Sequence, residues 1–141
     1  MTVKVVNFSA LPRTFNEKNK VSLVKKLGTA YVIAVTREKC SGCENQKPLF
    51  EKLSDKMQSD HGNRVEFLRI HSDFSAESKE EAMRCLEAFQ TVAFPTYVII
   101  IKDDQGKDRE TYRSIEPPMS EIERNIKMSV ELARWFDPKK Q

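Results

Sequence analysis

The sequence predicts an α/β protein in which helices flank both faces of a central mixed β-sheet. Segments with strand patterns alternate with segments of helical periodicity along most of the chain. Residues 31–36, YVIAVT, form an aromatic and β-branched run that is typical of a strand buried on both faces. Cys40 and Cys43 follow this run and precede an amphipathic segment, so we expect them at a strand-to-helix junction.

Composition is that of a small soluble protein. The 141 residues suit one compact domain spanning residues 1–141, and the hydrophobic fraction of 39% against 32% charged residues indicates a large surface. Met1 is not followed by an apolar run of signal-peptide length, and no stretch is apolar enough to cross a bilayer. We therefore expect a cytoplasmic monomer without a membrane partner.

The charge pattern does not favour binding to nucleic acid. The net charge is +3, and basic residues exceed acidic ones only over the first half of the chain. There they are interleaved with Glu and Asp instead of clustering with aromatic residues, and no groove-reading motif is present. We expect no nucleic-acid partner.

Cysteine usage indicates a reducing compartment. Three cysteines are too few, and odd in number, for a disulfide framework. A Cys-x-x-Cys pair in such a compartment is more often catalytic or metal-binding than structural. A zinc site would need two further protein ligands, and the candidates, Cys85, His61 and His71, are single and scattered. The sequence therefore favours thiol chemistry over a metal site.

The position of the cysteine pair supports this interpretation. Residues 44–57 carry apolar side chains at helical spacing, so Cys40 should lie near the amino terminus of a helix, with Gly42 easing the turn. Free backbone N–H groups and the helix dipole stabilise an anion at this place. We therefore expect the pKa of the Cys40 thiol to be lowered.

Neighbouring charges and the spacing of the cysteines bear on the same chemistry. Arg37 and Lys39 add positive charge before the first cysteine, although Glu38 and Glu44 partly offset it. On a first helical turn, residues i and i+3 lie about 5–6 Å apart on one side, a separation that a disulfide tolerates. Cys43 should therefore reach the sulfur of the first cysteine.

The remaining pattern predicts an ordered series of strands and helices. Strands are expected at residues 3–6, 31–36, 65–70, 97–101 and 109–115, with a hairpin turn at 103–106 between the last two. Capping boxes at residues 14–17, 78–81 and 120–123 predict three further helices. Cys85 shares one face of the second of these helices with Leu86 and Phe89, so its thiol should be buried as a small apolar group.

Three local motifs accompany this order of elements: Cys40-Ser41-Gly42-Cys43 at a strand-to-helix junction, Pro48 five residues past the second cysteine, and Phe94-Pro95-Thr96 just before a strand. Together with the order of elements, they resemble the thioredoxin family across almost the whole chain. Each motif alone is weak evidence, and their joint spacing is strong evidence. The resemblance implies the thioredoxin fold and a cis peptide bond before Pro95.

The resemblance also implies a role for each motif residue. Cys40 corresponds to the attacking thiolate and Cys43 to the resolving thiol of a thiol-disulfide exchange. The backbone of Phe94 is expected to pair with an extended substrate segment, while Pro95 excludes competing ligands from the sulfurs. The other expected substrate-binding residues are Thr96, Lys39, Ser41 and Gly42.

The chain departs from thioredoxins at positions that affect the chemistry. Lys39 stands where thioredoxins have tryptophan, and Ser41-Gly42 replaces Gly-Pro, which loosens the dipeptide. Ala34 replaces a buried aspartate that assists deprotonation of the resolving thiol, and the accompanying lysine corresponds to Phe67. The redox poise of thioredoxin therefore does not carry over.

The leading hypothesis is a thiol-disulfide oxidoreductase that exchanges disulfides with protein substrates and needs no bound cofactor. Its electrons would come from a reductase or a small thiol. The alternative is a thioredoxin-fold binding or adaptor module with weak or no turnover, which Ala34 and Lys39 make credible. A glutaredoxin-like enzyme is disfavoured because its Cys-Pro-Tyr-Cys motif and its glycine pair are missing.

Overall fold

A mixed five-stranded sheet forms the centre of the molecule. The computed structural model describes residues 3–8, 26–137 and 139, and its sheet has the strand order β1-β3-β2-β4-β5. β2 pairs in parallel with β3 and antiparallel with β4, which confirms the predicted mixed sheet. The strands are β1 (Val3–Val6), β2 (Ala30–Arg37), β3 (Val65–Ser72), β4 (Thr96–Lys102) and β5 (Asp108–Ile115).

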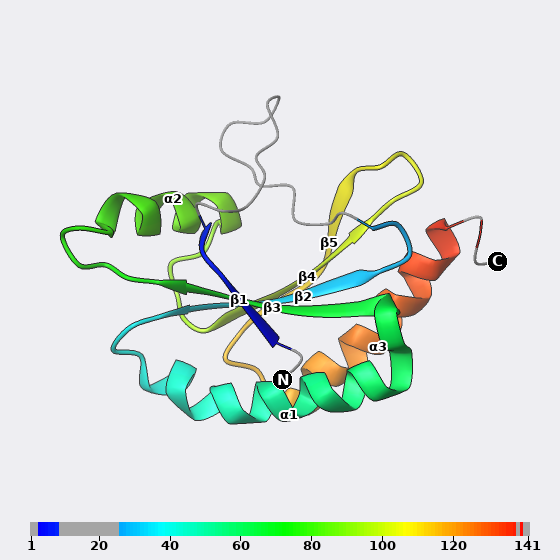
Figure 1. The fold of residues 1–141 in the computed structure, drawn as a ribbon, viewed down its shortest axis with the longest axis horizontal. Helices are drawn as coiled ribbons and strands as arrows, with labels where there is room; N and C mark the ends of the chain where they lie inside the picture. Colours follow the sequence, from blue (N-terminus) through cyan, green and yellow to red (C-terminus); the bar gives the residue numbers. More distant parts are fainter. Residues whose placement is uncertain (1–2, 9–25, 138, 140–141) are drawn as a thin grey trace.

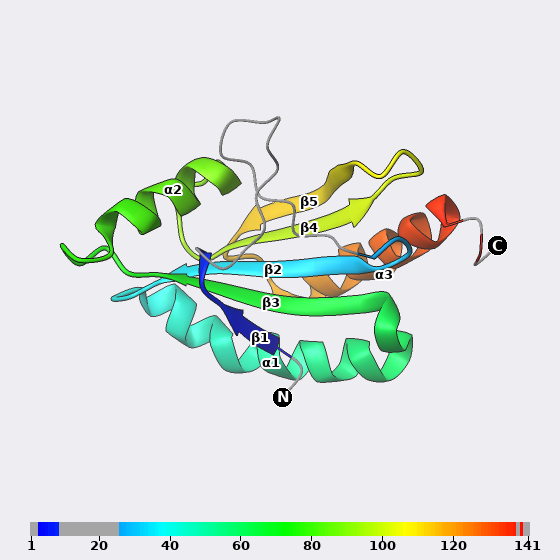
Figure 2. The same ribbon diagram turned by 45° about the horizontal axis from the view of Figure 1, so that its top comes forward.

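Helices cover both faces of this sheet, as the sequence predicts. α2 (Lys79–Phe89) lies on one face, and α1 (Ser41–His61) and α3 (Met119–Phe136) lie on the other (Figures 1 and 2). A short 3-10 helix, Gly62–Arg64, connects α1 to β3. The helix predicted after the capping box at residues 14–17 falls on residues outside the described part of the chain. None of the described helices has the length and apolar character that crossing a membrane requires.

Two apolar clusters fill the space between the sheet and the helices on its two faces. Beneath α1 and α3, Phe50 packs against Phe67 and Tyr97 with ring centroids 5.5 and 5.2 Å apart. On the α2 face, Ile33 and its neighbours pack against Cys85. β2 contributes to both clusters, which confirms that this strand is buried on both faces.

Helix starts differ in part from the capping-box predictions. Residues 120–123 predict a cap for the last helix, yet α3 begins at Met119 with Pro118 as its N-cap and without a side-chain capping bond. Pro118 already has a φ of −61°, close to the helical value, so the helix can begin directly after it. Ser78 is the N-cap of α2 as predicted, but its side chain makes no capping hydrogen bond.

The hairpin between β4 and β5 is held by one aspartate. The Asp103 side chain is 1% exposed, and its carboxylate accepts the backbone N–H groups of Gln105 and Lys107 at 2.9 Å and Nε of Arg109 at 2.8 Å. The Lys107 N–H lowers the pKa of Asp103, and the Arg109 guanidinium lowers it further. Asp103 therefore explains why the predicted turn forms at residues 103–106.

Candidate functional site

Cys40 lies at the amino terminus of α1. It is the N-cap residue, with an extended backbone, and its Sγ accepts the backbone N–H of Cys43 at 3.1 Å. Its carbonyl oxygen accepts the N–H of Glu44, also at 3.1 Å. The sulfur therefore occupies the place where unpaired N–H groups and the helix dipole favour an anion. This geometry confirms the predicted strand-to-helix junction.

The two cysteines form a disulfide within the first turn of α1. Their Cα atoms are 5.2 Å apart, which falls within the usual range for a disulfide. Cys43 is 6% exposed, whereas Cys40 is only half-buried. Solvent and a large partner therefore reach the first sulfur more readily than the second.

The turn before the cysteines is made by Lys39 instead of Gly42. Lys39 has a left-handed backbone with φ of 53°, and its side chain is exposed. Gly42 lies inside α1, so the expectation that it eases the turn is wrong. A Cβ at Gly42 would lie 2.6 Å from Oε1 and 2.9 Å from Cδ of Glu116. The absence of a side chain at Gly42 therefore leaves room for the Glu116 carboxylate, and Ser41 beside it is exposed.

The loop before β4 lies next to the cysteine junction. The Phe94–Pro95 peptide bond is cis, Pro95 is buried, and Phe94 is half-buried. Thr96 begins β4 opposite Val35 of β2, which brings this loop beside the end of β2. The Thr96 side chain is 1% exposed and its Oγ1 donates to the carbonyl oxygen of Ala93 at 2.7 Å. Thr96 therefore holds the loop from inside and does not reach the surface.

A charged and aromatic cluster joins this loop to the junction. The Arg37 guanidinium lies 4.3 Å from the ring centroid of Phe74 and 5.7 Å from that of Phe94. The Glu38 carboxylate accepts the backbone N–H of Phe74 at 3.0 Å and lies 3.5 Å from Nη2 of Arg37. Burial opposes ionisation of Glu38, but the Phe74 N–H, its own N–H and Arg37 outweigh burial and lower its pKa.

The strand register defines which side chains lie beside Ala34. Ala34 pairs with Arg69 on β3, while Phe67 pairs with Val32 and belongs to the same apolar cluster as Ala34. On its other side Ala34 pairs with Tyr97, which is 2% exposed. Burial raises the pKa of the Tyr97 phenol, the Glu116 charge raises it further, and Arg69 opposes both. A phenol and a guanidinium therefore flank the position where thioredoxins have an aspartate.

Glu116 is a further residue at the site that the sequence did not indicate. It follows β5, has a left-handed backbone with φ of 46°, and its N–H donates to the carbonyl oxygen of Pro95 at 2.9 Å. Its carboxylate lies against Gly42. One residue therefore contacts both the loop that contains Phe94 and Pro95, called the proline loop below, and residues 40–43, called the cysteine motif. These contacts join distant parts of the sequence, and no local pattern predicts them.

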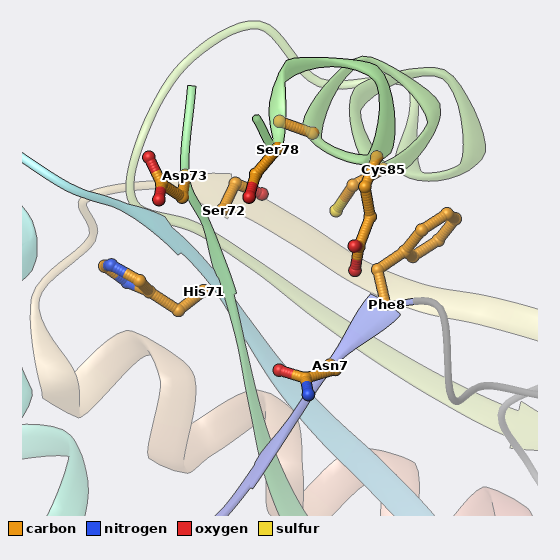
Figure 3. Close-up of a pocket in the computed structure, with 9 residues that line it drawn as sticks. Asn7, Phe8, His71, Ser72, Asp73, Ser78 and Cys85 are labelled. Carbon is orange, nitrogen blue, oxygen red and sulfur yellow. The ribbon is translucent and has the colours of Figure 1, made fainter. Parts of the chain in front are cut away.

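A separate pocket of about 280 Å³ lies between β3 and α2. Figure 3 shows Cys85 entering it from α2, near Ser72 and Phe8. Cys85 is 1% exposed, as predicted, and burial raises its pKa despite a hydrogen bond with Ser72. This thiol therefore lacks the activation expected of an exchanging cysteine.

Among the described residues, no three His, Cys, Asp or Glu side chains converge as metal ligands.

Neither a scan of protein-family models nor a search of curated proteins found a match. Solved structures with a similar fold include several thioredoxins. The long form of thioredoxin f from spinach chloroplast is 16% identical, with a TM-score of 0.59 over 91% of this chain and 86% of that chain. Fasciola hepatica thioredoxin is 24% identical, with a TM-score of 0.52 over 78% and 83% of the two chains. Malassezia sympodialis thioredoxin is 21% identical, with a TM-score of 0.54 over 73% and 76%.

Structural likeness at these low sequence identities shows the fold alone, so the chemistry has to be argued from the residues of this chain. The shared features are the mixed sheet, the helices on both of its faces and the Cys40–Cys43 disulfide at the start of α1. These features and the neighbouring structures together confirm the fold that the sequence motifs imply. The chain has the thioredoxin fold.

Proposed function

We propose that this protein is a thiol-disulfide oxidoreductase that exchanges disulfides with protein substrates through Cys40 and Cys43. The observation that carries the proposal is the position of the Cys40 sulfur. It lies at the amino terminus of α1, accepts the Cys43 N–H at 3.1 Å, and belongs to the more exposed of the two cysteines. A thiolate is stabilised at such a place and remains accessible to a second disulfide.

The exchange proceeds in two steps. The Cys40 thiolate attacks one sulfur of a substrate disulfide, the substrate S–S bond breaks, and the other substrate sulfur leaves as a thiolate that takes up a proton. Cys43 then loses its proton and attacks the Cys40 sulfur, which releases the remaining substrate sulfur. The substrate gains two electrons, and the protein is left with the Cys40–Cys43 disulfide seen in the structure. A reductase or a small thiol must then restore the dithiol.

The surroundings of the dithiol support a protein substrate. The backbone around Phe94 and Pro95, together with Lys39, Ser41 and Gly42, provides the surface against which an extended segment binds. Val92, 91% exposed, and Ile115, 58% exposed, add apolar contact area close to the proline loop. Thr96 contributes by holding the loop, because its side chain is buried. We infer that the protein acts as a single-domain monomer in a reducing compartment such as the cytoplasm.

The adaptor hypothesis has one structural observation in its favour. The position beneath the dithiol that holds a carboxylate in thioredoxins is occupied by Ala34, with Tyr97 and Arg69 opposite it. Deprotonation of Cys43 must then rely on solvent, which slows the second step. A module that binds substrates without efficient turnover would have this feature.

Reduction of insulin by dithiothreitol separates the two functions. We expect the native protein and Cys85→Ser to accelerate insulin reduction, because Cys85 is buried away from the dithiol. Cys40→Ser should reduce insulin no faster than dithiothreitol alone. Equal, slow rates for the native protein and Cys40→Ser would contradict the enzyme and support the adaptor.

A further inference from the structure

We propose that Glu116 determines substrate specificity at the dithiol, so that disulfides flanked by basic residues react faster than disulfides flanked by acidic ones. The inference deepens the proposed function and rests on it. It concerns the substrate class, which neither the fold nor the cysteine motif defines. The occupant of the site would be an extended segment carrying Lys or Arg next to its disulfide.

The position of Glu116 places its charge inside the site. Its backbone N–H donates to the Pro95 carbonyl oxygen at 2.9 Å, which fixes the residue beside the proline loop. Its carboxylate lies against Gly42, where an added Cβ would be 2.6 Å from Oε1 and 3.2 Å from Oε2. A substrate that binds along the proline loop and presents its sulfur to Cys40 therefore passes this carboxylate.

The charge of Glu116 is available to a substrate. Within the described part of the chain, no ion pair or side-chain hydrogen bond engages its carboxylate, and the residue is exposed. The Glu38 carboxylate, by contrast, already accepts the Phe74 N–H and lies 3.5 Å from Nη2 of Arg37. Arg37 is in turn held by Glu38 and by the rings of Phe74 and Phe94.

Other charged groups near the dithiol are placed differently. Lys39, before Cys40, has an exposed side chain on a turn, while Glu44 and Lys47 are exposed on α1. Glu116 combines a contact to Gly42 of the cysteine motif with a hydrogen bond to Pro95 of the proline loop. The Glu116 charge acts on the Tyr97 phenol of β4, on which Arg69 of β3 has the opposite effect.

The same charge has two chemical consequences. An uncompensated carboxylate attracts a cationic flanking residue and repels an anionic one, and water displaced by the docked substrate strengthens both effects. Glutathione disulfide, which is anionic at neutral pH, should be a poor substrate for the same reason. The carboxylate also disfavours a thiolate nearby, so removing it should lower the pKa of Cys40.

The test compares three peptides that share one disulfide and differ only in the flanking residues, which are Lys, Gln or Glu. Rates of exchange with the reduced native protein and with Glu116→Gln are measured at low and high salt. We expect the ratio of kcat/KM for the Lys peptide over the Glu peptide to fall about fivefold to tenfold in Glu116→Gln. High salt should reduce the native ratio and leave the variant ratio nearly unchanged.

Glu44→Gln is the matched control, because it removes the same charge from an exposed position one residue past Cys43. Its ratio should stay within about twofold of the native one. Glu116→Asp, which keeps the charge on a shorter side chain, should give an intermediate ratio. The pH dependence of Cys40 alkylation supplies an independent measurement, with a lower midpoint expected in Glu116→Gln.

The outcomes separate this inference from the function on which it rests. If the native protein exchanges none of the three peptides, the proposed function fails and the inference fails with it. If the Gln peptide reacts but the Lys-to-Glu ratio is the same in the native protein and in Glu116→Gln, only the inference is overturned. An equal loss of selectivity in Glu44→Gln would also overturn it, because a diffuse negative surface would then explain the result.

Discussion

Two carboxylates lie at opposite ends of β5 and are treated differently by the fold. Asp103, before the strand, is 1% exposed and accepts hydrogen bonds from Gln105, Lys107 and Arg109. Glu116, after the strand, is exposed, and its carboxylate has no such partner among the described residues. Figure 1 shows the hairpin turn and the start of α1 at opposite ends of the sheet. A buried charge with hydrogen-bond partners stabilises a turn, whereas an exposed, hydrated charge beside a dithiol remains available to a binding partner.

The largest expected effect comes from replacing the two cysteines and tests whether they perform the exchange reaction. In Cys43→Ser, the mixed disulfide between Cys40 and a protein substrate should accumulate, because no second thiol is left to resolve it. In Cys40→Ser no mixed disulfide should form, and turnover should fall roughly a hundredfold or more in both variants. Mass spectrometry of the trapped adducts checks this. Accumulation of the adduct in Cys40→Ser would reverse the assigned roles.

The next effect contrasts the two carboxylates in stability. Asp103→Asn should lower the thermal midpoint by several degrees, since the turn loses charge-assisted hydrogen bonds to two N–H groups and Arg109. Glu116→Gln should leave the midpoint within about 2 °C of the native value. Thermal unfolding followed by circular dichroism measures both. The comparison breaks if Glu116→Gln is the more destabilising of the two.

The loss of stability at acid pH should depend in part on the ionisation of Asp103. The Lys107 N–H and Arg109 lower the pKa of Asp103 in the folded state. The ionised carboxylate therefore contributes fully to the free energy of unfolding above the unfolded-state pKa of about 3.9. The contribution is lost as the pH falls through the lower folded-state pKa. The difference in urea midpoint between the native protein and Asp103→Asn should therefore shrink below about pH 4. A constant difference at all pH values would show that ionisation of Asp103 is not the cause.

The smallest effect concerns the glycine that admits Glu116. In Gly42→Ala the new methyl group must displace the Glu116 carboxylate, which is the mobile end of a long side chain. Stability should therefore change by less than about 1 kcal/mol, because the gain in helix propensity opposes the displacement. The Lys-to-Glu peptide ratio should fall by about twofold, less than in Glu116→Gln. A ratio unchanged by Gly42→Ala would argue against a substrate-facing carboxylate at this position.

The fold could be predicted closely where local pattern determines it. The runs at residues 31–36 and 97–101 are so apolar that β2 and β4 extend only one residue beyond each end of them. The start of α3 was harder to place because the capping-box pattern at residues 120–123 competes with Pro118, whose backbone already fits the entry to a helix. Local signals therefore identify the elements and leave some of their boundaries open.

Some features of the candidate site also follow from local sequence, and others depend on contacts between distant segments. Cys40 at the start of α1 follows from the order of neighbouring segments, because strand, cysteines and helix are consecutive in the sequence. The pairing of Ala34 with Arg69 depends on the register of two distant strands, and the approach of Glu116 to Gly42 depends on how β5 leads into α3. Neither contact has a local pattern, so the charge that surrounds the dithiol could be found only in three dimensions.

The most direct test of a thiol-disulfide exchange site is the rate of alkylation at Cys40 of the reduced protein as a function of pH, in a Cys85→Ser background. The modified cysteine is identified by mass spectrometry. Because the sulfur lies at the amino terminus of α1 and accepts the Cys43 N–H, the midpoint should lie below the value of about 8.5 for free cysteine. A rate that follows free cysteine would show that no thiolate is stabilised there and would contradict the proposed chemistry.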